Sequence, residues 1–133
     1  MIRILLAASL LFAPVAAHAD WYEASTDHFV VYSDDSPERL EKFATQLERF
    51  DKALRAMRGL AAHPVGDANR VVVYVVGGTG TVSRLAKDSQ AAGFYRARAG
   101  GSMAVVPRQA GYDELDLSSQ AILLHEYTHH LML

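Results

Sequence analysis

The residues best suited to chemistry lie near the C-terminus, where His125, Glu126 and His129 form the pattern H-E-x-x-H. An α-helix completes a turn in 3.6 residues, so two imidazoles four positions apart share a face and can bind one metal ion. Glu126 lies beside the first histidine and can reach a water on that metal, as a general base must. The pattern therefore predicts a Zn²⁺ site with His125 and His129 as ligands and Glu126 as the catalytic residue.

The flanks of the motif leave a second interpretation open. Residues 121–124 read Ala-Ile-Leu-Leu and residues 131–133 read Leu-Met-Leu, which is typical of a buried helix. Two histidines and a carboxylate inside such a helix are costly unless they share a partner, and a metal ion is the simplest partner. The alternative is a buried helix that carries two structural histidines.

The segment H-E-Y-T-H-H at residues 125–130 resembles the active-site helix of gluzincin-type peptidases, specifically the peptidase MA-like domains of bacterial secreted proteins. Those domains often precede tetratricopeptide repeats. Residues 21–24 and 27–32 are similar to the way such domains open, so the resemblance covers about residues 21–133. It implies peptide hydrolysis with Zn²⁺ as cofactor and, as third ligand, a glutamate on a later helix.

The end of the sequence bears on that third ligand. Met132 stands where a metzincin would have glycine, which argues against that subtype. The sequence stops inside an apolar helical run without a helix stop signal, so we expect a truncated domain whose third ligand lies beyond Leu133. Residues 20–133 alone are then expected to bind zinc weakly, to lack peptidase activity and to fold poorly.

The first 19 residues have the pattern of a secretory signal peptide. A basic residue precedes a short apolar run at residues 4–12, and residues 17–19 form an Ala-x-Ala cleavage site. The run is shorter than the roughly 20 residues that span a membrane, although an uncleaved short anchor is the alternative. We therefore expect a mature domain at residues 20–133, exported to the periplasm or outside the cell, with no integral membrane segment.

Composition narrows the class of protein. Half of the 133 residues are hydrophobic and 21% are charged, which is typical of one globular domain with its own core. The formal net charge is −2 and basic residues are not clustered, so nucleic acid is not an expected partner. Cysteine is absent, so the fold of an exported domain must depend on its core and on any bound metal.

Hydrophobic patterning and turn residues predict the element order β-α-β-α-β-β-α. The predicted strands and helices are residues 28–33 (strand), 37–58 (helix), 70–76 (strand), 81–87 (helix), 94–98 and 103–106 (a hairpin), and the H-E-x-x-H helix. The continuous β-branched run at residues 70–76 is expected to be a central strand buried on both faces. The order predicts an α+β fold, a zincin-like mixed twisted sheet packed on helices, truncated after the H-E-x-x-H helix.

The resemblance also suggests where a substrate would bind. In zincins, an edge strand over the metal helix pairs with the extended peptide substrate by strand addition. The candidate substrate-binding strand here consists of Met103, Ala104, Val105 and Val106.

These observations favour zinc-dependent hydrolysis of a peptide or protein substrate by the full-length protein. A catalytically inactive zinc-binding scaffold or protein-interaction module remains an alternative. A nucleotide-binding module is another, because Gly-Gly-Thr-Gly at residues 77–80 follows a predicted strand. Its signature is incomplete, since Ser83 replaces the third glycine of a dinucleotide fingerprint and no Gly-Lys-Ser/Thr follows, so a flexible turn is preferred.

Overall fold

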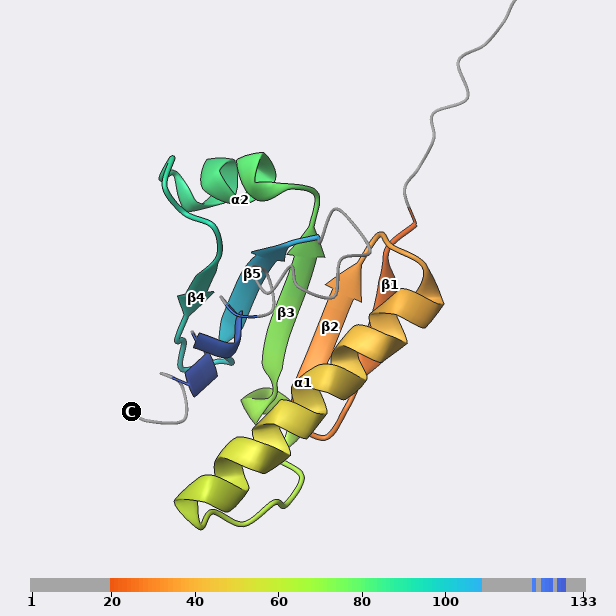
Figure 1. Ribbon diagram of the computed structural model, residues 1–133, viewed down its shortest axis with the longest axis vertical. Coiled ribbons are helices and arrows are strands. Elements are labelled where there is room, and N and C mark those ends of the chain that lie inside the picture. Colours follow the sequence, from red (N-terminus) through yellow and green to blue (C-terminus); the bar gives the residue numbers. More distant parts are fainter. Residues whose placement is uncertain (1–19, 109–120, 122, 126, 129–133) are drawn as a thin grey trace, which may run out of the picture.

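A computed structural model describes residues 20–108, 121, 123–125, 127 and 128, and the predicted signal peptide at residues 1–19 lies outside them. The fold is α+β, as predicted, with a five-stranded mixed sheet in the order β1-β2-β3-β5-β4 (Figure 1). Its strands are β1 (Tyr22–Ser25), β2 (Phe29–Ser33), β3 (Val71–Val76), β4 (Phe94–Arg96) and β5 (Met103–Pro107). Strands β2, β3 and β5 are parallel, and the outer strands β1 and β4 are antiparallel to their neighbours.

Helix α1 (Pro37–Arg58) has the bounds that its end signals predict. The Ser36 hydroxyl accepts a hydrogen bond from the Arg39 N–H at 3.4 Å, and Pro37 occupies the first turn. Gly59 ends the helix with φ 65°, a left-handed conformation that glycine adopts without a side-chain clash. Two further helices are η1 (Asp67–Asn69), a 3₁₀ turn, and α2 (Thr79–Ala86).

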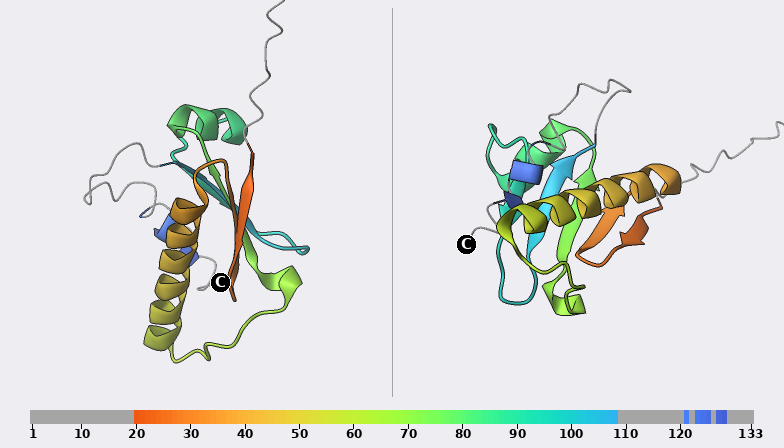
Figure 2. Two further views of the ribbon diagram at one scale, coloured as in Figure 1. Left: turned by 90° about the vertical axis from the view of Figure 1, so that its right-hand side faces the viewer. Right: turned by 60° about the horizontal axis from the view of Figure 1, so that its bottom comes forward.

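The two faces of the sheet carry separate hydrophobic clusters. The larger one lies under α1 and also includes Leu123 and Tyr127 from the C-terminal helical residues. The smaller one, on the other face, contains Val82 of α2 packed on Val76 and Val105. Figure 2 shows α1 and the C-terminal helical residues on the same side of the sheet. The motif-bearing segment is therefore part of the main core.

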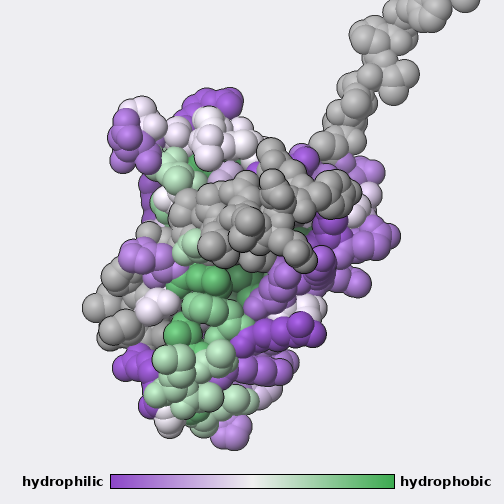
Figure 3. Space-filling model, viewed as in Figure 1, coloured by the Kyte–Doolittle hydropathy of each residue, from purple (hydrophilic) through white to green (hydrophobic). Residues whose placement is uncertain are grey.

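The surface beside α1 is partly apolar. On this face, Figure 3 shows hydrophobic surface next to the hydrophilic surface of α1. Met57 and Leu60, at the C-terminal end of α1, are 84% and 42% exposed. The apolar residues of this helix are thus buried at Leu40, Ala44 and Leu47 but not at its C-terminal end.

Strand β1 was not predicted, because it has only 4 residues and most of its side chains are exposed, so its hydrophobic pattern is weak. It pairs with β2 and forms one edge of the sheet. The observed order therefore begins with two strands before α1, where the sequence indicated one.

The expectation that residues 103–106 form an edge strand is wrong. Strand β5 pairs with β3 on one side and with β4 on the other, so the backbone of β5 is already hydrogen-bonded on both sides. Ala104, Val105 and Val106 are all buried, which suits an inner strand, whereas the short β4 ends on the exposed Arg96 and forms the edge. The hairpin itself is confirmed, and Gly101 has φ 117° in its connecting loop.

Candidate functional site

The described part of the H-E-x-x-H segment is helical and has a buried and an exposed side. Leu123 and Tyr127 are 1% and 2% exposed and face the core, whereas His125 is exposed. His125 lies two residues from each, about 200° round a helix, so it is on the side away from the core. Glu126 and His129 lie outside the described residues. The structure thus supplies the orientation of one of the two predicted metal ligands.

Tyr127 attaches this helix to α1 through its ring and its hydroxyl. The ring lies 4.9 Å from the Phe29 ring, between centroids, and the hydroxyl donates a hydrogen bond to Asp51 Oδ1. Burial, followed by this hydrogen bond, raises the pKa of Tyr127 well above its ordinary value of 10.0, so the phenol remains a donor. Tyr127 is therefore packed in the core.

Asp51 is the centre of this arrangement. Its side chain is fully buried, and the Arg55 Nε lies 2.9 Å from Oδ1 and 2.7 Å from Oδ2. Burial acts to lower the pKa of Arg55, but the hydrogen bonds to Asp51 outweigh it and the pKa is raised. A buried carboxylate is stable only with such partners, because desolvating an unpaired charge is expensive.

His28 lies against the same carboxylate from the start of β2. Its Nδ1 is 2.6 Å from Glu48 Oε1 and 3.3 Å from Asp51 Oδ2, and its Nε2 is 3.0 Å from the His63 carbonyl oxygen. All three neighbouring atoms are oxygens, so each can accept a hydrogen bond from a ring nitrogen of His28. We call His28, Glu48, Asp51, Arg55 and Tyr127 the buried polar network.

The network also contains a possible metal-binding triad. One ligand atom from each of His28, Glu48 and Asp51 lies within 4.8 Å of the others, so the three could hold a metal ion. One imidazole nitrogen with two carboxylates is a donor set that suits Zn²⁺ and other divalent ions. Binding through Nδ1 would require that nitrogen to be unprotonated, because a histidine ligand donates its lone pair. The positive charge of Arg55, 14% exposed beside Asp51, would oppose the metal's charge.

This network was not predicted from the sequence. The i,i+4 spacing of Asp51 and Arg55 is typical of an ion pair on the solvated face of a helix, and that interpretation is wrong here, because Asp51 is buried. The spacing of the buried residues of α1 could have indicated it. Leu40, Ala44 and Leu47 are separated by four and then three residues, so the next position expected to be buried is residue 51. A carboxylate at a core position of an amphipathic helix indicates a buried partner.

The residues predicted to bind substrate divide between the two faces of the sheet. Ala104 and Val106 belong to the core under α1, whereas Met103 and Val105 line a hollow on the opposite face. Strand side chains alternate, so one strand cannot direct all four toward one ligand.

The glycine-rich segment at residues 77–80 forms the connection from β3 into α2, with Gly78 as the residue before the helix. Arg108 N–H donates to the carbonyl oxygens of Val76 and Gly77 at 2.6 and 2.8 Å. These bonds give the segment a structural role as a turn, which is the interpretation that its sequence favours.

Comparisons of the chain with protein-family models, with curated proteins and with solved structures find no match. Within the part of the chain that the structure describes, no helix is both long enough and apolar enough to cross a membrane.

Proposed function

We propose that the protein is a zinc-dependent peptidase in which His125 and His129 bind the metal and Glu126 is the general base. The observation that supports this most is the orientation of the motif helix, whose Leu123 and Tyr127 are buried while His125 is exposed. Continued helical spacing would put His129 about 40° from His125, on the same side away from the core. Two ligands on that side would be open to a third ligand and to substrate.

The roles of the residues follow from ordinary zinc-peptidase chemistry. Zn²⁺ would supply Lewis-acid activation of a water molecule and of the scissile carbonyl. Glu126 would take a proton from the attacking water and deliver it to the leaving amine. The resemblance to gluzincin peptidases implies a third carboxylate ligand, which we expect beyond Leu133.

The substrate would bind along β4 rather than along residues 103–106. Among the described strands β4 pairs only with β5, so it is the edge strand to which an extended peptide could add. Tyr95 of β4 packs on the core cluster that includes Leu123 and Tyr127, so this edge lies on the side of the sheet where the motif helix packs.

The test uses the full-length protein with Glu126→Gln, which keeps the size of the side chain but removes the base. Zinc content, measured by mass spectrometry, should stay at the wild-type level, and hydrolysis of a peptide library should fall by about 10² or more. Glu41→Gln, an exposed change on α1, is the matched control and should leave the rate unchanged. Wild-type rates in Glu126→Gln would show that the proposed mechanism is wrong.

The scaffold interpretation is supported by a different observation, the triad of His28, Glu48 and Asp51. If the metal serves structure, it would bind at this triad, and His28→Gln would lose zinc while His125→Ala would keep it. The peptidase proposal predicts the reverse. Zinc stoichiometry of the two variants therefore separates the two functions without an activity assay.

A further inference from the structure

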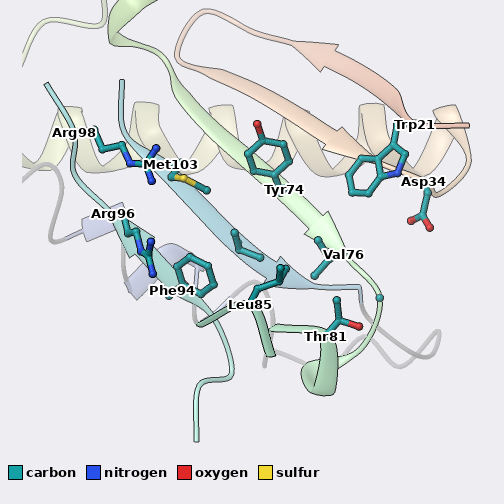
Figure 4. A pocket seen from close by; sticks show the side chains of 12 residues that line it. Trp21, Asp34, Tyr74, Val76, Thr81, Leu85, Phe94, Arg96, Arg98 and Met103 are labelled. Atoms are coloured by element: carbon teal, nitrogen blue, oxygen red, sulfur yellow. The ribbon is translucent and has the colours of Figure 1, made fainter. Parts of the chain in front are cut away.

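The face of the sheet opposite α1 is only partly covered by the described residues. Strands β2, β3 and β5 are parallel, and parallel strands are ordinarily covered on both faces. On this face, α2 packs through Val82 at the C-terminal ends of β3 and β5. Next to it lies a hollow of about 720 Å³, seen in Figure 4 with α1 behind the sheet.

The floor of the hollow is apolar and aromatic. Tyr74, Met103 and Val105 belong to it, and the rim includes Trp21 and Leu85, whose side chains are 51% and 52% exposed. Concave surfaces of this size that combine apolar walls with a few polar groups are typical of small-molecule sites. Exposed large apolar side chains around such a hollow also favour a ligand.

One wall of the hollow carries two positive charges. Figure 4 shows Arg96 and Arg98 together on the β4 side. The Arg96 guanidinium lies 5.2 Å from the centre of the Phe94 ring. In the described part of the chain, no carboxylate forms an ion pair with Arg96 or Arg98. The acidic residue of the lining, Asp34, is paired with Arg108. The hollow therefore has an excess of positive charge beside an apolar floor.

We propose that this hollow binds a small organic anion with an apolar body, such as a medium-chain carboxylate. Arg96 and Arg98 would bind the carboxylate, because a guanidinium offers two parallel N–H donors that match its two oxygens. The apolar body would lie on Tyr74 and Met103, toward Trp21. This site is on the opposite face of the sheet from His125 and does not depend on the proposed peptidase function.

Trp21 is the only tryptophan of the chain and lines the hollow, so its fluorescence reports on a ligand there. We would titrate the full-length protein with octanoate and with octanamide, which has the same chain and no charge. Octanoate should give a saturable change in Trp21 emission with an affinity at least about 10-fold higher than that of octanamide.

The variant Arg96→Gln with Arg98→Gln should lower the octanoate affinity about 10-fold and leave the octanamide affinity unchanged. The control, Arg49→Gln with Lys52→Gln, removes the same charge from exposed positions on α1 and should bind octanoate as wild type does. Three results would each overturn the proposal: no saturable emission change with octanoate, equal affinities for the two ligands, or unchanged octanoate affinity in the Arg96/Arg98 variant.

Discussion

At the scale of single residues, Asp51 connects several separate parts of the chain through its buried carboxylate. Its buried carboxylate accepts hydrogen bonds from Arg55 and from the Tyr127 hydroxyl, and it lies 3.3 Å from His28 Nδ1. Four parts of the chain thus converge near it: α1, the start of β2, the loop that carries His63 and the motif helix. Such a group is costly to bury alone but stable when all its partners are present.

Asp51→Asn should lower the free energy of unfolding by about 3–5 kcal/mol, because it leaves the charge of Arg55 without its buried partner. The matched control is Asp67→Asn, since Asp67 is 96% exposed and pairs with Arg70 at 3.1 Å. A surface pair of that kind contributes about 0–1 kcal/mol. Urea unfolding of both variants measures the difference, and equal losses would contradict the central role of Asp51.

At the scale of elements, the contact between the motif helix and α1 rests on the Tyr127 side chain. Its ring packs on Phe29 and its hydroxyl binds Asp51, so one residue combines apolar burial with a directional bond. The neighbouring His125 faces the opposite way. We infer that this attachment sets the rotation of the helix about its axis, and with it the direction of the proposed metal ligands.

Tyr127→Phe removes the hydroxyl but keeps the ring, and should lower the free energy of unfolding by about 1–3 kcal/mol near neutral pH because the buried Asp51 loses a donor.

This loss of stability should depend on pH. The pKa of Tyr127 is raised in the native state, so above about pH 10 the unfolded chain releases a proton that the native protein retains. This stabilisation is complete below about pH 10 and decreases as the pH rises further. The stability gap between wild type and variant should therefore narrow in alkaline urea titrations, and a constant gap would contradict the assignment.

At the scale of the whole molecule, the sheet separates two candidate sites. The motif helix and the buried polar network lie on the α1 face, whereas the hollow with Arg96 and Arg98 lies on the other. The central strands contribute side chains to both faces by alternation, so a single sheet can support two unrelated ligands. The intervening core is close-packed, with Val73 and Phe29 fully buried.

This separation predicts that the two sites act independently. His125→Ala should lose zinc but bind octanoate with the wild-type affinity, measured by Trp21 emission. Arg98→Gln should weaken octanoate binding but retain the wild-type zinc content. Energetic effects of distant sites with no shared partners ordinarily add within about 0.5 kcal/mol. Loss of both ligands in either single variant would indicate that the sites are coupled through the sheet.

Features that depend on interactions between neighbouring residues could be predicted from the sequence. Helix α1 begins after Ser36 and ends at Gly59 because capping is a local interaction, and its bounds were predicted correctly. The run at Val71–Val76 was identified as a central strand from its β-branched residues alone. The H-E-x-x-H motif is also local, since helical spacing relates its histidines.

Contacts between segments that are distant along the chain could not be predicted from the sequence. The sequence indicates that Met103–Pro107 is a strand, but its inner place in the sheet depends on pairing with β3, which lies about 30 positions earlier in the sequence. The burial of Asp51 likewise follows from the approach of His28 and Tyr127, which are 23 and 76 residues away along the chain. A charged residue on a helix is ordinarily solvated, and only partners from other elements make its burial favourable.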